Sequence, residues 1–115
     1  GVTAIFSQTD IMALGAIEGL WDSGLKVPGD VAIVSYDDIG FGKDFRPRLT
    51  TVHQPRDRLA IAACNRVAEL LACGVGGPEY VTKEHRLQRR VQPYLVVRES
   101  CGAERREDVV REKRV

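Results

Sequence analysis

The sequence predicts an α/β fold built from βαβ units of a parallel, doubly wound sheet. Two short apolar runs, residues 4–6 and 31–34, are typical of strands, and residues 11–23 between them repeat apolar side chains at helical spacing. Two consecutive strands joined by one helix lie parallel, and ligands bind beyond the carboxyl ends of such strands. Acidic residues follow both runs, so we expect a binding crevice at that edge.

The first unit can be justified element by element. Both strands are continuous apolar runs, as in strands covered on both faces, so we expect both to be buried. Thr9 or Asp10 can cap the helix by accepting hydrogen bonds from free backbone N–H groups, and Gly24 can end it. Pro28 and Gly29 predict the turn before the second strand. The predicted core face of the helix comprises Ile11, Ala13, Leu14, Ala16, Ile17, Leu20 and Trp21.

A second unit follows a loop at residues 39–48. The β-branched content of residues 49–54 predicts a third strand, which Pro55 ends. Residues 56–73 predict an amphipathic helix, and a glycine-rich break follows at 74–78. Residues 94–97 predict the last strand. The apolar face of the second helix comprises Leu59, Ala62, Ala63, Val67, Leu70 and Leu71.

Composition excludes several classes of partner. The 115 residues include 17 basic and 16 acidic ones, a formal net charge of +1, so no overall field attracts nucleic acid or an anionic membrane. No apolar run reaches the roughly 18 residues of a membrane helix, and no signal-like segment is visible. We expect a soluble, cytoplasmic chain. Residues 103–115 are mostly charged and predict a disordered tail.

The cysteines and histidines do not predict a metal site. Cys64, Cys73 and Cys101 are widely spaced and have no histidine at metal-ligand spacing, so we expect reduced thiols and no metal or cofactor. We interpret His53 and His85 as surface or boundary residues rather than functional ones.

Four motifs resemble, in order, the C-terminal part of the effector-binding core of LacI/GalR transcription regulators. They are TDIMALGA at 9–16, GLKVPGDVAIVSYDD at 24–38, PRLTTVHQP at 47–55 and LVVRES at 95–100. The resemblance covers residues 1–102. It implies a two-lobed, periplasmic-binding-protein-like core of type I, whose cleft takes a sugar or a nucleobase. Its implied partners are this effector, a second copy of the protein, and operator DNA through a helix-turn-helix that the chain lacks.

The absence of a phosphate loop or a GxSxG motif leads us to expect no enzymatic activity. The resemblance also implies a division of the chain. Residues 1–54 would belong mainly to the C-terminal lobe, 55–92 mainly to a helix and crossing of the N-terminal lobe, and 93–102 to a returning strand.

The resemblance implies effector-binding residues at the strand ends. Asp37 matches the family's effector-binding aspartate, in a pattern that usually opens with Gly where this chain has Ser35. An ionised carboxylate can accept from two sugar hydroxyls or from a purine N–H. Thr9 matches a position where some sugar-responsive members carry Asn. Further candidates are Asp10, Asp38 and Arg56, with a helix cap, a turn and a surface position as the respective alternatives.

Gly15 and Gly19 lie four residues apart on the first predicted helix, where each glycine costs about 1 kcal/mol relative to alanine. Close approach of a neighbouring backbone would offset this cost, either from a partner or from the chain's own sheet. The resemblance places a dimer interface here, comprising Met12, Leu14, Gly15, Phe45 and Leu49.

Two other classes remain open. A sugar-binding transport protein would use the same cleft. A phosphoacceptor receiver domain would hold Mg²⁺ with Asp37 and Asp38, but no lysine ends a later strand, and no phosphate loop is present.

Overall fold

The computed structural model describes residues 1–72 and 90–103. It divides into two units, one comprising Gly1–Gln54 with the chain from Pro93, the other running from Pro55 to Gln92. Each unit is described by itself. Several predictions lie outside the described residues: the glycine-rich break at 74–78, Cys73, His85 and the charged tail beyond residue 103.

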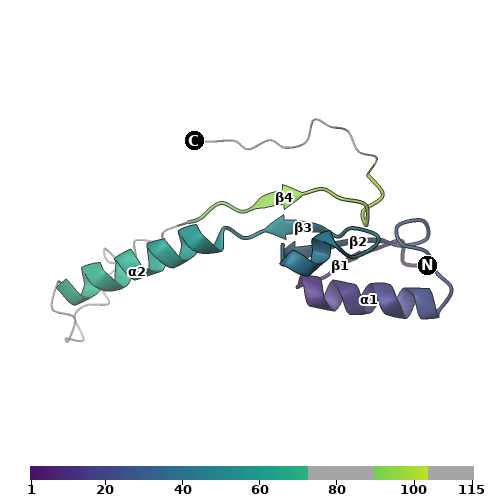
Figure 1. Cartoon of the computed structure of the whole chain (residues 1–115), viewed down its shortest axis with the longest axis horizontal. Helices are drawn as coiled ribbons and strands as arrows, with labels where there is room; N and C mark the ends of the chain where they lie inside the picture. The colour runs from purple at the N-terminus through teal and green to yellow at the C-terminus, as the bar shows by residue number, and fades with distance from the viewer. Residues whose placement is uncertain (73–89, 104–115) are drawn as a thin grey trace. The chain divides into compact units, whose positions relative to one another are not determined.

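The first unit holds a four-stranded sheet in the order β1-β2-β3-β4 (Figure 1). Its strands are β1 (Ala4–Phe6), β2 (Ala32–Asp37), β3 (Thr50–His53) and β4 (Tyr94–Val96). The first three are parallel, which confirms the βαβ prediction. The last strand, whose direction the sequence does not predict, runs antiparallel to β3 with Tyr94 opposite His53, so the sheet is mixed. The chain leaves β3 and re-enters β4 at the same edge, so β4 must run back along β3.

The helix α1 (Asp10–Asp22) begins and ends much as the sequence predicts. Thr9 is its N-cap, and its Oγ1 accepts from the Met12 N–H at 3.3 Å. At the other end Gly24 has a φ of 76°, and its N–H bonds to the Trp21 carbonyl at 2.9 Å, while the Leu25 N–H bonds to the Leu20 carbonyl. This pair of bonds is the Schellman motif, which glycine favours because it accepts a positive φ.

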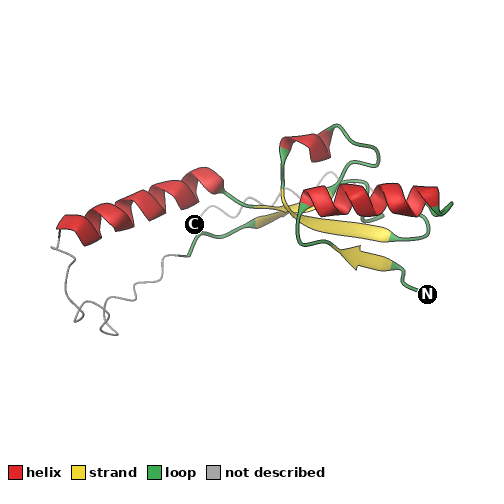
Figure 2. Ribbon diagram, turned by 90° about the horizontal axis from the view of Figure 1, so that it is seen from below, coloured by secondary structure: helices red, strands yellow, loops and turns green. Residues whose placement is uncertain are grey.

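The core lies between α1 and one face of the sheet. It consists of Ala13, Ile17, Val27, Ile33 and Leu49. The helix runs alongside the strands in both views (Figures 1 and 2). A short 3-10 helix, η1 (Gly40–Lys43), lies in the predicted loop, and beyond it Phe45 stacks on Trp21 with ring centroids 5.5 Å apart.

The prediction that both apolar strands are buried is wrong for β1. Phe6 is 67% exposed, because the described part of this unit carries a long helix on only one face of the sheet. Ile11 is also exposed, since the inward face of α1 is defined by Asp10, Ala13 and Ile17.

The described part of the second unit is the helix α2 (Arg56–Ala72), close to its predicted bounds. None of its residues is buried, and Leu59, Ile61, Val67 and Leu71 are exposed. None of the described helices is long and apolar enough to cross a membrane.

Candidate effector-binding site

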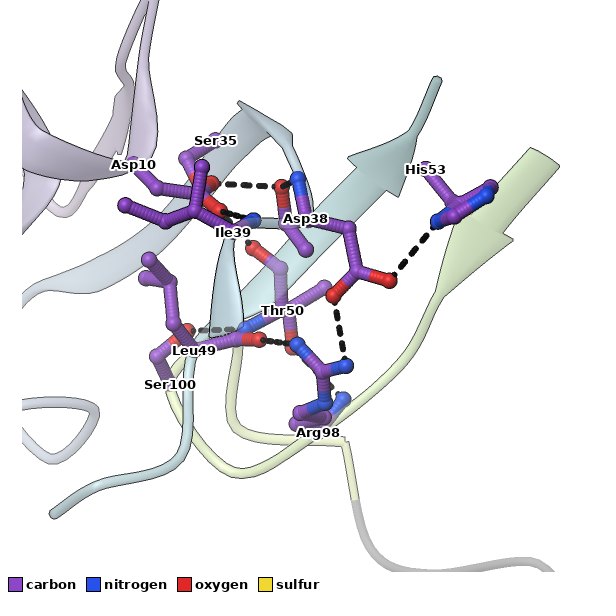
Figure 3. Close-up of polar contacts among 10 residues, drawn as sticks. Asp10, Ser35, Asp38, Ile39, Leu49, Thr50, His53, Arg98 and Ser100 are labelled. Atoms are coloured by element: carbon purple, nitrogen blue, oxygen red, sulfur yellow. Dashed lines mark hydrogen bonds and ion pairs between the residues drawn. The ribbon is translucent and has the colours of Figure 1, made fainter. Parts of the chain in front are cut away.

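Asp10 stands where the chain turns from β1 into α1, and its carboxylate is fully buried. Its Oδ1 accepts from Ser35 Oγ at 2.5 Å and from Thr51 Oγ1 at 2.6 Å, and its Oδ2 accepts from the Ile39 N–H at 2.8 Å (Figure 3). These bonds join α1, β2, β3 and the segment after β2. Asp10 therefore has a structural role, and its burial does not favour the predicted effector contact.

Ser35, which departs from the usual family pattern, belongs to this same buried group. Its hydroxyl donates to Asp10, and its side chain is 0% exposed. The added hydroxyl thus strengthens the anchoring of Asp10.

Asp38 uses both carboxylate oxygens inside the protein. Arg98 Nη2 donates to Oδ1 at 2.7 Å, and His53 Nδ1 lies 2.9 Å from Oδ2 (Figure 3). The side chain is only 10% exposed. Burial acts to raise the pKa of Asp38, but the hydrogen bonds and positive charges of Arg98 and His53 outweigh it and lower this pKa below its ordinary value. Asp38 is therefore anchored within the unit.

Arg98 is itself held in place. Its Nη1 donates to the Leu49 carbonyl at 2.8 Å, and its backbone N–H donates to Thr50 Oγ1 at 2.8 Å. Just beyond it, the Ser100 hydroxyl accepts from the Thr50 N–H and donates to the Ile33 carbonyl (Figure 3). The segment after β4 is thus bonded to β2 and β3, which fixes the base of the Arg98 side chain.

The backbone at the end of β2 is strained. Asp37 has a φ of 118° and Asp38 a φ of 54°, a region that residues other than glycine rarely adopt. Each such residue costs on the order of 1–3 kcal/mol and persists only where its surroundings hold it. The Asp38 N–H bonds to Thr51 Oγ1 at 3.3 Å, and the next N–H, of Ile39, bonds to Asp10. The hydrogen bonds of the Asp38 and Ile39 N–H groups therefore hold the strained backbone in place.

Asp37 differs from both other aspartates. It is half-buried, and within residues 1–72 and 90–103 its carboxylate has no hydrogen-bond or ion-pair partner. A carboxylate without a partner, at the carboxyl end of a parallel strand, is able to accept hydrogen bonds from a ligand.

The remaining predicted residues divide between several positions. Thr9 lies at the same edge as Asp37 but caps α1, and Arg56 is the exposed first residue of α2 in the second unit.

Of the predicted dimer residues, Met12 is 58% exposed and Gly15 is exposed, whereas Leu14 and Phe45 are half-buried. Leu49 is different, because it is 0% exposed in the core and its side chain is not available to a second copy.

Sequence reasoning missed two residues of this site. The sequence assigns no role to Arg98 and predicts that His53 is a surface or boundary residue. In the structure His53 faces Asp38 and stacks on Tyr94, with ring centroids 4.6 Å apart. The contact of His53 with Asp38 depends on the register of β3 with β2, and that of Arg98 on the antiparallel pairing of β4 with β3. The sequence carries no local signal for either pairing.

The comparison with protein families identifies the fold. The family model of the periplasmic binding protein-like domain matches residues 2–101 of this chain. The chain belongs to this family. The match gives no support to a phosphoacceptor receiver domain, the third class left open above.

Individual relatives place the chain more narrowly. The chain is 39% identical over 98 residues to the HTH-type transcriptional repressor PurR of Histophilus somni. The aligned region covers 85% of this chain and 27% of the repressor. Among solved structures, a putative LacI-family regulator from Sanguibacter keddieii matches with a TM-score of 0.70 and 36% identity, covering 88% of this chain and 36% of that one. The regulator CelR, solved with cellobiose, matches with a TM-score of 0.72 and 30% identity, covering 86% and 28%.

These likenesses show that the chain is part of the effector-binding core of a LacI/GalR-type regulator. The chain spans 27% of the length of the PurR relative, so this likeness does not show the activity of a whole regulator.

Proposed function

We propose that this chain is the effector-binding and dimerisation part of a LacI/GalR-type transcription regulator. A small polar ligand, a sugar or a nucleobase, binds at Asp37 and alters operator binding by a helix-turn-helix elsewhere in the full-length, intracellular protein. Solved relatives support a ligand of this kind, since CelR holds cellobiose and a LacI-family regulator from Lactobacillus casei holds sucrose.

The observation that carries the proposal is the difference between the two neighbouring carboxylates. Asp38 is occupied by Arg98 and His53, whereas Asp37 has no partner within the described residues. An ionised carboxylate is an acceptor only, so its natural ligands carry hydroxyl or N–H donors. Sugars and nucleobases both do. Thr9, at the same edge of the sheet, remains a further candidate for this ligand, and Arg56 of the second unit remains an effector-binding candidate considered by itself.

The proposal is tested in the full-length regulator with Asp37→Asn. Calorimetry with cellobiose, lactose, sucrose, hypoxanthine and guanine identifies the compound that binds the unsubstituted protein most tightly. We expect Asp37→Asn to weaken its binding at least about tenfold, the effect of losing one charge-assisted hydrogen bond. Operator binding without effector should stay within about twofold, since the Asp37 carboxylate has no other partner among residues 1–72 and 90–103.

The matched control is Asp22→Asn, which removes a carboxylate at the exposed end of α1. Effector affinity that is the same in the Asp37 and Asp22 variants would refute the proposal. A protein that binds a sugar but no DNA at all would instead favour the transport alternative.

Dimerisation through the first part of α1 is supported by two observations. A Cβ atom built on Gly15 or Gly19 would meet nothing within 4 Å among the described residues, so tight packing on the chain's own sheet does not explain these glycines. Met12 and Ile11 beside them are 58% and 70% exposed. A second copy that packs against this helix would bury both side chains and use the room above the glycines.

A further inference from the structure

Arg98 and Asp38 form the centre of a group whose hydrogen bonds determine the backbone next to Asp37. Both Asp38 oxygens are bound, one to the guanidinium of Arg98 and the other to the His53 ring. Figure 3 shows Asp38 between these two side chains, with Arg98 also reaching the Leu49 carbonyl. The carboxylate of Asp38 is thus tied to β3 and to the segment after β4.

This anchoring has a consequence for Asp37. The positive φ values of Asp37 and Asp38 are unfavourable for residues with a side chain, so an unanchored chain would relax toward extended or right-handed conformations. In the extended conformation, successive side chains point to opposite faces of the sheet. The direction of the Asp37 carboxylate therefore depends on what holds Asp38.

We propose that Arg98 and His53 are positioning residues for effector binding, which act through Asp38 to hold Asp37 in its strained conformation with the carboxylate free for ligand. The proposal rests on the proposed function of Asp37. Neither positioning residue needs to touch the effector.

The chain offers a matched control in Arg48. Its guanidinium binds Glu99, with Nε donating to Oε1 at 2.8 Å and Nη2 at 2.7 Å from the same oxygen. This ion pair joins the same two segments as the bond from Arg98 to the Leu49 carbonyl, but it does not involve Asp38. Arg98→Gln and Arg48→Gln thus each remove one arginine from this junction, and only the first releases Asp38.

The first measurement uses the full-length regulator and the compound from the calorimetric panel that it binds most tightly. We expect Arg98→Gln to weaken binding about tenfold or more, and Arg48→Gln less than about twofold. In the Asp37→Asn background, Arg98→Gln should change the affinity by less than about twofold, because residues that act through one another are not additive. Additive effects, or equal effects of the two arginine variants, would overturn the proposal.

The second measurement needs no ligand. A crystal structure of full-length Arg98→Gln should show Asp37 and Asp38 without their positive φ values, whereas Arg48→Gln should retain them. If Arg98→Gln does not fold, Asp38→Ala replaces it, because alanine removes the anchored carboxylate and still disfavours the left-handed conformation. A folded Asp38→Ala protein with undiminished affinity would overturn the proposal.

The results separate this inference from the function on which it rests. If Asp37→Asn leaves the affinity unchanged, both fail. If Asp37→Asn weakens binding and Arg98→Gln does not, only the positioning role fails.

Discussion

Thr51 donates its hydroxyl proton to Asp10 across 2.6 Å, and both side chains are 0% exposed. The same Thr51 oxygen accepts the backbone N–H of Asp38 at 3.3 Å. One hydroxyl therefore connects the buried carboxylate at the start of α1 to the strained backbone at the end of β2, next to the candidate site.

Asp10→Asn should destabilise the protein. Asn keeps one acceptor oxygen in place of two and turns an N–H₂ group toward buried donors, where the carboxylate accepts from Ser35, Thr51 and Ile39. We expect a loss of about 3 kcal/mol in the free energy of unfolding, the order found when a buried charged acceptor loses its partners. Urea unfolding of the full-length variant measures it.

The control for this loss is the exposed Asp22→Asn, which should change stability by less than about 0.5 kcal/mol. Equal stabilities of the Asp10 and Asp22 variants would show that the three bonds to Asp10 contribute nothing net.

Leu49 and Met12 should respond differently to truncation. Leu49→Ala removes a 0%-exposed core side chain and should cost about 2–5 kcal/mol of folding stability. Met12→Ala removes a side chain that is 58% exposed, so it should leave folding nearly unchanged while weakening the proposed dimer. Thermal unfolding and sedimentation equilibrium distinguish the two effects. An unaltered dimer dissociation constant in Met12→Ala would count against this surface as the interface.

The ion pair of Asp38 should make stability depend on pH in the acid range. The folded protein holds the Asp38 carboxyl ionised beside Arg98, so its pKa is lower than the ordinary 3.8 of the unfolded chain. A depressed folded pKa gives stability that is fully present above 3.8 and is lost as the pH falls through the folded value.

The measurement compares unfolding free energies of the full-length parent and Asp38→Asn from about pH 5 downward. We expect the parent's excess in unfolding free energy over Asp38→Asn to shrink below pH 3.8, since only the parent can take up a proton at this side chain. An advantage that stays constant throughout the acid range would contradict the assigned ion pair.

The 115-residue chain by itself should expose apolar surface. Phe6 and Phe41 are 67% and 77% exposed, and Ile61 and Leu71 on α2 are 61% and 71% exposed. Exposed apolar side chains of this number favour association. The chain expressed alone should bind the dye ANS and associate in analytical ultracentrifugation. A monomeric chain without ANS binding would show that these residues find cover within the chain.

The sequence predicted much of the local structure and less of the site. Helix α1 with its Thr9 cap and Gly24 end, the parallel pair β1 and β2, and the position of Asp37 at a strand end all follow from residue types within a few positions of each other. By contrast, the sequence did not predict the buried partners of Asp10 or the ion pair of Asp38.

The sequence by itself determined the elements, the parallel direction of the first two strands and the family resemblance, because apolar periodicity, capping residues and turn residues act over short stretches of chain. Only the tertiary structure decided that Asp10 is buried, that Asp38 is anchored and that Asp37 has no partner among the described residues. The deciding bonds join residues 41 positions apart for Thr51 and Asp10 and 60 apart for Arg98 and Asp38. Such partners meet only through the register of β3 with β2 and the antiparallel return of β4, and neither is written in the local pattern of residues.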